Sequence, residues 1–487
     1  MLKMIKASTL ALGTLSIIYY RSPPKQQSQL DGYFYSTINS VLAVKVLASS
    51  VFDYTYSLKN IDYNSEEYHK VRSEVHYRVA NRILGVSVRS RGIYFKAGQY
   101  LGNLDRIMPA EFTQVLSVLQ DSAPPLSYDQ IIEVINQDLP GALSQFKSFD
   151  KEAIAAASLA QVHKAVLFNG STVAVKIQYP FLQTQTPSDF YVLRIITQIC
   201  NVLLKYHEFH GIDLLKIWET FKDMCIQEVD FLHEKKNAEI TKKIFGGDSS
   251  VYVPDMIDKL CCSRVLVMEF VDGVKSNDIE GIKKLGLKNQ DVANALIDTF
   301  GKMIFLEGHV HCDPHPGNIF IRKVNDRPQI VLLDHGFYRY ISSEFRLDFC
   351  ELWQSLIKND YPKVEKIAQK LGLGEYFRYL PLILLYRTMS STKPIGETMT
   401  VDERRNLHKS NEITFEKLTN LMQRLPPDLI FISRTSNLIA INNLKLGGTT
   451  RHRLMKFTDF SLQALYKGWR FYWEKLKLFV FLLYNRL

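Results

Sequence analysis

Two loops in the second half of the chain carry the side chains best suited to chemistry. Residues 311–318 read HCDPHPGN and residues 332–336 read LLDHG. Asp313 and Asn318 are five positions apart, and Asp334 follows an apolar run. Phosphoryl transfer uses such a set, because one carboxylate orients the acceptor while oxygen ligands hold Mg²⁺ against the nucleotide phosphates. We predict Asp313 as the catalytic residue and Asn318 and Asp334 as metal ligands.

An ordinary turn is the competing interpretation of either loop. Proline, glycine and asparagine favour turns whatever their function. The two loops together, in this order and each beside a predicted strand, match the catalytic and metal loops of kinases. The pair therefore favours the functional interpretation.

A lysine upstream fits the same chemistry. In residues 173–177 (VAVKI) alternate side chains fall on one face of a strand, so that Lys176 lies opposite the core-facing valines. A kinase lysine in this position contacts the α- and β-phosphates and is held by a glutamate. Glu228 and Glu234, on the next long helical stretch, are both candidates for that glutamate.

The rest of a nucleotide site is less regular. Residues 268–273 (MEFVDG) read as a hinge between two lobes, where adenine would bond to the backbone near Glu269 and Val271. The glycine-rich phosphate loop expected before Lys176 is missing. In its place are Ala155, Ala156, Ala157 and Ser158. Alanine restricts positive φ, although backbone N–H groups can still face phosphates.

The elements that must position these residues form an α+β pattern. Residues 31–145 are mainly helical, with Ser127 as a helix cap, and another helical stretch covers residues 189–245. Strands are predicted at residues 162–168, 172–177, 265–270, 319–322 and 329–333. Asn169-Gly170 predicts a tight turn in the first hairpin. Beyond residue 341 the chain again reads as helices.

Composition limits the classes of partner. The 487 residues carry a formal charge of +10, which favours an anionic partner. Basic residues do not alternate with aromatic ones along a stripe, and zinc-finger spacing is missing, so nucleic acid is excluded as a partner. The six cysteines are scattered and predict reduced thiols rather than a disulfide framework.

The two ends of the chain suggest a membrane and an organelle. Residues 1–30 are basic and lack Asp and Glu, as in a mitochondrial targeting segment. Their apolar run, residues 7–20, is shorter than the ~20 residues of a membrane span. Residues 466–487 mix aromatic and basic side chains, which fits either an interfacial membrane helix or a terminal helix packed on the core.

Taken together, these motifs resemble the UbiB family of atypical kinases, also called aarF-domain-containing kinases, over residues 60–350. Residues 96–99 (KAGQ) match the family's Lys-x-Gly-Gln motif, and residues 228–230 (EVD) match its Glu-x-Asp motif. The resemblance implies a bilobal protein-kinase-like fold with helical N- and C-terminal extensions. It also implies that Lys96 and Gln99 gate access to the site, contacting Glu228 and Asp230.

The resemblance predicts five segments. They are a targeting or membrane segment (1–30), a helical extension (31–148), an N-lobe (149–271), a C-lobe (272–394) and a second helical extension (395–487). The expected cofactors are ATP or ADP with Mg²⁺. The expected partners are a membrane lipid or quinone at the mitochondrial inner membrane, in lipid or coenzyme Q homeostasis. The alternatives are a pseudokinase that carries or senses lipid without turnover, and a kinase for a mitochondrial protein.

Overall fold

The chain folds into two compact units. The computed structural model describes residues 24–484 except 64, 105–107, 121–124, 207–212, 390, 392, 398–420 and 422–423. Among the described residues, those from 24 to 206, 213 to 231 and 256 to 269 form unit 1, and those from 232 to 255 and 270 to 484 form unit 2. Most of the predicted targeting segment, including residues 7–20, lies outside the described residues. The predicted α+β class is confirmed, and the five predicted segments stay a prediction.

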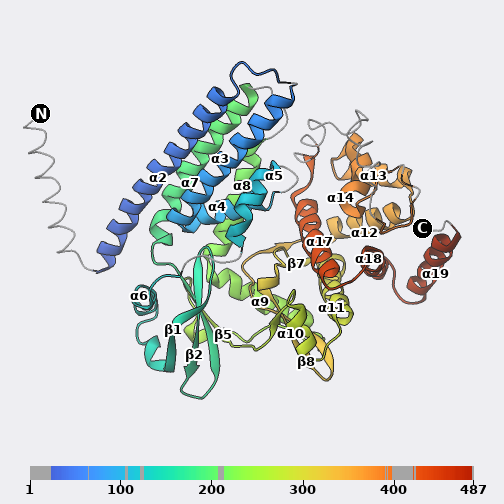
Figure 1. Ribbon diagram of the computed structural model, residues 1–487. Coiled ribbons are helices and arrows are strands. Elements are labelled where there is room, and N and C mark those ends of the chain that lie inside the picture. The colour runs from blue at the N-terminus through green and yellow to red at the C-terminus, as the bar shows by residue number, and fades with distance from the viewer. Residues whose placement is uncertain are drawn as a thin grey trace, which may run out of the picture. The chain divides into compact units, whose positions relative to one another are not determined.

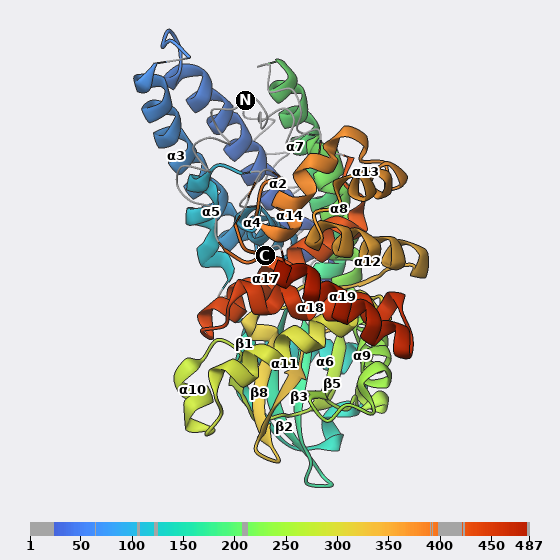
Figure 2. The same ribbon diagram turned by 90° about the vertical axis from the view of Figure 1, so that its right-hand side faces the viewer.

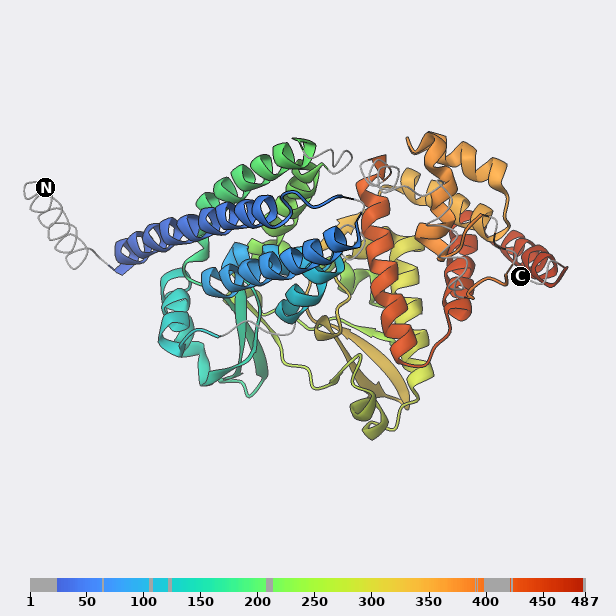
Figure 3. The same cartoon turned by 45° about the horizontal axis from the view of Figure 1, so that its top comes forward.

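Helices make up most of unit 1. They are α2 (Pro24–Ser57), α3 (Glu66–Ser90), α4 (Gly92–Gly102), α5 (Ala110–Leu116), α6 (Tyr128–Asp138), α7 (Leu182–Tyr206) and α8 (Leu214–Val229). α2 lies alongside α3 and α7, and α7 alongside α8 (Figures 1 and 3). Val75 and Val79, one helical turn apart on α3, are buried in a core with Phe112. Ser127 starts α6 with a capping box, as predicted.

Among the residues that the structure describes, one helix has the length and composition of a membrane span. It is the part of α2 from Gly32 to Ser57, which has a mean hydropathy of 1.3. Only 22% of the most apolar 18-residue stretch of this helix is buried. A core helix, or a signal sequence near the N-terminus, meets the same criteria. The exposed side chains on this helix include Phe34 and Phe52, both more than 60% exposed.

The sheet of unit 1 has the strand order β1-β2-β3-β5 and is antiparallel throughout. Its strands are β1 (Phe146–Ala156), β2 (Ala160–Leu167), β3 (Thr172–Gln178) and β5 (Val265–Glu269). The turn between β2 and β3 has Gly170 at φ 89°, a conformation that suits glycine, so the predicted Asn-Gly hairpin is confirmed. β1 was not predicted. Most side chains of β1 are exposed on both faces of the strand. Its sequence therefore does not alternate between apolar and polar residues, which is the pattern that predicts a strand.

Unit 2 contains two small sheets and a helical layer. Its strands are β4 (Val251–Tyr252), β6 (Val274–Lys275), β7 (His309–His311), β8 (Ile319–Val324), β9 (Arg327–Leu332) and β10 (Tyr338–Tyr340). The sheet orders are β4-β9-β8-β6 and β10-β7. The predicted hairpin over residues 319–333 is confirmed as β8–β9.

The helices of unit 2 surround an aromatic core. They are α9 (Phe231–Phe245), α10 (Ile279–Lys284), α11 (Asn289–Gly301), α12 (Ser343–Ile357), α13 (Tyr361–Lys370), α14 (Leu380–Leu385), α17 (Pro427–Lys445), α18 (Thr450–Leu465) and α19 (Trp469–Tyr484). α11, α17 and α18 pack together (Figure 2). The rings of Phe305, Trp353 and Phe457 lie 5.5–5.8 Å apart in pairs. The C-terminal helix α18 is therefore part of the hydrophobic core of unit 2.

Candidate functional site

The loop that carries Asp313 is fixed at both ends. Before it, β7 pairs with β10, and the Cys312 N–H donates to the Phe337 carbonyl (3.1 Å). The Asp313 N–H donates to His311 Nδ1 (3.1 Å). Asn318 Nδ2 then donates to the Asp313 carbonyl (3.1 Å) and to its Oδ2 (3.2 Å). The five-residue spacing thus lets one amide hold the predicted catalytic carboxylate.

Asp334 is brought to the same loop by the β8–β9 hairpin. The Leu333 N–H donates to the Asn318 carbonyl (3.0 Å), so the two predicted metal ligands lie at the same end of the hairpin. The Gly336 N–H donates to Asp334 Oδ1 (2.9 Å). Asn318 points its NH₂ toward Asp313, which leaves its amide oxygen for a cation. An amide oxygen and a carboxylate are donors that Mg²⁺ accepts, so these residues fit the ion.

His335, where an ordinary kinase has Phe, is a buried support for the metal loop. Its Nε2 lies 3.1 Å from the Leu332 carbonyl, and its Nδ1 lies 2.9 Å from the Tyr338 hydroxyl. Because a carbonyl only accepts, Nε2 carries a proton and donates it to the Leu332 carbonyl. The neighbouring His311 ring is also fully buried, and burial lowers its pKa. The two buried rings therefore support the loops that carry Asp313 and Asp334.

Helix α9 supports the same loop from the other side. Glu234 is buried, and its Oε1 accepts from the His335 N–H at 3.4 Å. Asn237, one turn later, donates from Nδ2 to the His335 carbonyl (3.0 Å). Glu234 thus contacts the metal loop of unit 2. Whether it or Glu228 also serves Lys176 stays a prediction.

Helix α17 supplies a residue that sequence analysis missed. Arg434 Nη2 lies 3.5 Å from Asp313 Oδ1, and the two side chains are 25% and 33% exposed. Thr435 Oγ1 donates to the His311 carbonyl (3.4 Å), and Asn442 Nδ2 donates to the Pro314 carbonyl (3.4 Å). These residues are more than a hundred positions from the loop, and no motif surrounds them. Only the fold reveals that the C-terminal extension contacts the catalytic loop.

In unit 1, Lys176 lies at the centre of the sheet. It is in register with Val162 on β2 and Leu266 on β5, and its Nζ lies 5.2 Å from the centre of the Phe231 ring. Val173, Val175 and Ile177 on the same strand are buried, as the alternation predicted. The strand therefore directs the Lys176 side chain to the opposite face of the sheet, where Phe231 is buried beside Leu266.

The alanine-rich segment is partly strand rather than wholly loop. Ala155 and Ala156 end β1, in register with Val162 and Gln161 of β2. The turn begins at Ala157, whose N–H donates to the Ala160 carbonyl (2.8 Å) and whose carbonyl accepts from the Tyr179 hydroxyl (3.0 Å). Ser158 is buried. Antiparallel pairing forms this turn with alanine in place of glycine.

The Lys-x-Gly-Gln segment lies on α4 and contacts α8. Lys96 Nζ lies 2.7 Å from Glu228 Oε2, with the two side chains 17% and 15% exposed. Gln99 Nε2 donates to the Leu119 carbonyl (2.8 Å), which fastens α4 to the turn after α5. Asp230 is exposed at the C-terminal end of α8. The expected contact of Lys96 with Glu228 is present in unit 1.

The predicted hinge lies where the chain passes from one unit to the other. Glu269 ends β5, in register with Val173, and is the last residue of its segment in unit 1. Val271 is buried and belongs to the segment of unit 2 that begins at Phe270. Binding of adenine at these two residues stays a prediction.

Comparison with known proteins agrees with this arrangement. The ABC1 atypical kinase-like domain matches residues 118–368. AarF domain-containing protein kinase 1 of Mus musculus is 35% identical over 465 residues, covering 94% of this chain and 86% of the mouse protein. AarF domain-containing kinase 1 of Drosophila melanogaster is 32% identical over 392 residues, covering 78% of this chain and 74% of the fly protein.

A solved structure supports the fold. Rv3197 of Mycobacterium tuberculosis, in complex with erythromycin, aligns with a TM-score of 0.50 at 20% identity, covering 80% of this chain and 99% of that chain. At this identity the likeness concerns the fold alone. The kinase-like fold implies nucleotide binding. From its matched domain and its identity to the AarF proteins, this chain belongs to the ABC1/aarF family of atypical kinases.

Proposed function

We propose that this chain is a Mg²⁺-dependent, ATP-binding kinase or ATPase. The observation that carries the proposal is the cluster of Asp313, Asn318 and Asp334 within unit 2. Asn318 donates to Asp313 (3.1 and 3.2 Å), and its carbonyl accepts from the N–H of Leu333, the residue before Asp334 (3.0 Å). Charged and polar groups fixed before the reaction lower its barrier more than mobile groups do. A hydrogen-bonded set of this kind is suited to catalysis, although simple nucleotide binding also uses it.

Each residue has a role in this proposal. Asp313 accepts the proton of the acceptor hydroxyl or of water, while Asn318 and Asp334 would hold Mg²⁺. When bound, the ion would neutralise charge on the phosphates. Lys176, assisted by Glu228 or Glu234, orients the α- and β-phosphates. The alanine-rich turn offers the backbone N–H of Ser158 to the phosphates, because the Ala157 N–H already donates to the Ala160 carbonyl.

The biological setting belongs to the same proposal. We infer action on a membrane lipid or quinone, in mitochondrial lipid or coenzyme Q homeostasis. The basic, acid-poor residues 1–30 and the apolar helix from Gly32 to Ser57 support a membrane location. Fractionation of cells, with the parent compared with a chain lacking residues 1–30, tests the organelle.

A pseudokinase that carries or senses lipid is the second candidate. The ion pair of Lys96 with Glu228 favours it, because it engages one of the two carboxylates available to Lys176. The turn of alanines instead of glycines also favours slow turnover. The complete set of three site residues favours an enzyme.

ATP hydrolysis by the full chain separates these two functions. It is measured with Mg²⁺, with and without anionic vesicles, beside Asp313→Asn and Asp334→Asn. Asp326→Asn is the matched control, since that carboxylate is 90% exposed on the β8–β9 turn, where φ is 60° and suits asparagine. Turnover that is lost in both site variants and kept in the control supports the enzyme. Mg²⁺-dependent nucleotide binding, lost in Asp334→Asn without any turnover in the parent, supports the pseudokinase.

The third possibility, phosphorylation of a mitochondrial protein, has a separate test. If α4 excludes protein acceptors, Lys96→Gln should phosphorylate added mitochondrial protein while the parent does not. Labelling by the parent at the same rate as the variant would show that Lys96 does not gate protein substrates.

A further inference from the structure

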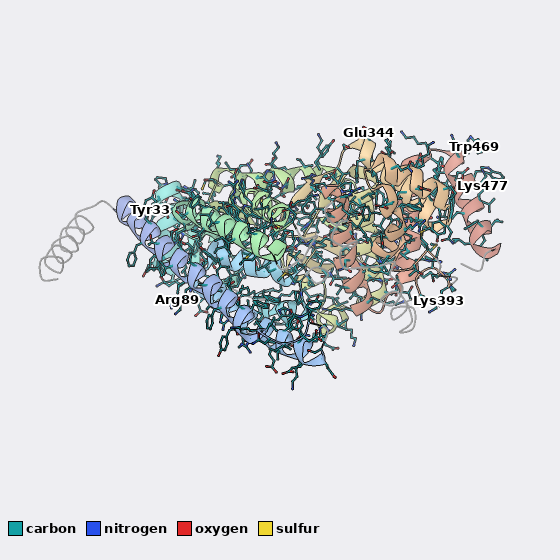
Figure 4. The ribbon with its side chains drawn as sticks, turned by 90° about the horizontal axis from the view of Figure 1, so that it is seen from above. Tyr33, Arg89, Glu344, Lys393, Trp469 and Lys477 are labelled. Carbon is teal, nitrogen blue, oxygen red and sulfur yellow. The ribbon has the colours of Figure 1, made fainter. Side chains whose placement is uncertain are left out.

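The last described helix, α19, exposes a stripe of large apolar side chains. Six of them are Trp469, Tyr472, Trp473, Leu476, Phe479 and Val480, all between 49% and 78% exposed. At about 100° per residue these positions fall within an arc of about 120° on the helix. Figure 4 shows Trp469 on this helix at the outer edge of unit 2. A soluble helix normally turns such a stripe toward the core.

The opposite face of α19 already makes the contact with the rest of unit 2. Leu478 is 4% exposed, and Phe471, Phe481 and Leu482 are partly buried. α19 packs on α18, where Lys475 forms an ion pair with Asp459 (2.8 Å). The helix therefore has two apolar faces, and the one packed on the protein is not the aromatic one.

Basic side chains border the exposed stripe on both sides. Arg470 and Lys477 lie on one border and Lys475 on the other, by their helical positions. From Lys467 to Leu483 there are four basic residues and one acidic residue, a net charge of 4 − 1 = +3. This pattern of aromatic centre and cationic borders matches the interface of an anionic membrane, where rings sit among headgroups and cations meet phosphates.

We propose that α19 is a membrane-docking helix that inserts its aromatic stripe into the headgroup region of an anionic bilayer. A second copy of the chain is the competing occupant. Pairing of two such stripes would bring together two segments that each carry a net charge of +3, and like charges oppose that contact. The bilayer satisfies both the apolar stripe and its cationic borders.

The helix lies on the membrane rather than crossing it. Its 16 residues span about 24 Å, which is shorter than the ~30 Å hydrocarbon core. Its packed face also remains against α18. The proposal concerns a surface remote in sequence from the phosphoryl-transfer residues, and vesicle binding is measured without nucleotide. Failure of one proposal therefore does not affect the other.

Vesicle sedimentation with the full chain tests the proposal. The parent should bind vesicles of phosphatidylcholine with 30% phosphatidylglycerol more tightly than phosphatidylcholine alone, and less tightly as NaCl rises. Leu476→Glu with Phe479→Glu should weaken binding about tenfold or more. Arg470→Gln with Lys477→Gln should also weaken it about tenfold, on anionic vesicles only. Leu444→Glu is the matched control, because Leu444 is 56% exposed on α17 of the same unit.

Tryptophan fluorescence reports on α19 directly. The chain has four tryptophans, and Trp218 and Trp353 are buried, so emission changes on adding vesicles come mainly from Trp469 and Trp473. A blue shift, with quenching by brominated lipid, is expected. Trp469→Phe with Trp473→Phe should lose the shift and keep most of the binding. Unchanged vesicle binding by Leu476→Glu with Phe479→Glu would overturn the proposal, and if light scattering showed that variant to lose a dimer, the stripe would be a contact between copies.

Discussion

Arg434 on α17 contacts Asp313 of the catalytic loop, although the two residues are 121 positions apart in the chain. Its guanidinium lies 3.5 Å from Asp313 Oδ1, on the opposite side of the carboxyl group from the Oδ2 that Asn318 holds. Two donors on two oxygens restrict the rotation of the carboxylate. In the proposed enzyme, Arg434 is a positioning residue.

Replacing Arg434 with methionine should lower kcat by about tenfold to hundredfold, because a misplaced catalytic group costs that much even when it is still present. KM for ATP should change little, and Arg434→Lys should recover part of the rate. Steady-state kinetics measure both values. Lys445→Gln, exposed at the end of the same helix, is the control. If KM for ATP instead rose by the same factor by which kcat fell, Arg434 would be a ligand of the nucleotide phosphates.

Local chemistry explains which site residues the sequence predicts. Asp313, Asn318 and Asp334 follow fixed spacings within a loop and a hairpin. Hydrogen bonds join Asn318 to Asp313 and to Leu333, the residue before Asp334. Arg434 has no such spacing, since its contact with Asp313 depends on how α17 packs. His335 is visible in the sequence, but its bond to Tyr338 needs the β7–β10 pairing.

At the scale of elements, the contact of α4 with α8 carries a testable energy. Lys96 and Glu228 form a partly buried pair at 2.7 Å. Lys96→Met or Glu228→Gln alone should each destabilise unit 1 by about 3 kcal/mol, because each leaves a charge in a poorly solvated place. The double variant should lose much less free energy of unfolding than the sum of the losses in the two single variants. Chemical denaturation measures the cycle, and strictly additive losses would show that the pair does not couple the two helices.

The packing of α2 on α7 includes a buried acid. Asp189 is 1% exposed and accepts from Ser36 Oγ (3.5 Å), and burial raises its pKa from 3.8 to about 7. Between about pH 4 and pH 7 the folded chain therefore keeps the proton on Asp189, whereas the unfolded chain has lost it. Its stability falls as pH rises from about 4 to about 7, and the loss is complete above that range.

Asp189→Asn should remove this dependence, since asparagine has the same shape and no charge. The Asn variant's gain in the free energy of unfolding should be about 2.7 kcal/mol larger at pH 8 than at pH 5, which is the equivalent of about two pKa units. Urea denaturation at the two pH values measures it. Asp150→Asn, exposed on β1, should show no such trend. The same gain at both pH values would mean that Asp189 is already charged in the folded chain.

Elements with a strong local signal are the ones that sequence predicts well. The hairpin around Gly170 and the alternating strand at Lys176 have such a signal. β1 carries Lys, Glu and Ala on an exposed edge, where neither propensity nor alternation indicates a strand. α7 starts at Leu182 and includes Pro187. Because proline is unfavourable inside a helix, the sequence predicts the start of this helical stretch after it, at residue 189, which is too late.

At the scale of the whole molecule, nucleotide binding should appear as thermal stability. A ligand at 100 times its Kd stabilises the folded state by about 2.7 kcal/mol. Mg²⁺ with ADP should therefore raise Tm by several degrees, and EDTA should remove the rise. Asp334→Asn should lack it, while Asp326→Asn should keep it. A rise that survives in Asp334→Asn would place the nucleotide's metal elsewhere.

The last strand of the sheet in unit 1, β5, is synthesised long after the strand with which it pairs, β3. β5 pairs with β3, Val265 beside Ile177, 88 residues after the strand it covers. A ribosome adding about 5–20 residues per second needs about 4–18 s for that stretch. Throughout this time β3, with Val173, Val175 and Ile177, has an unpaired edge. The nascent chain is therefore most open to aggregation between the synthesis of β3 and β5, which is the interval in which a chaperone would protect it.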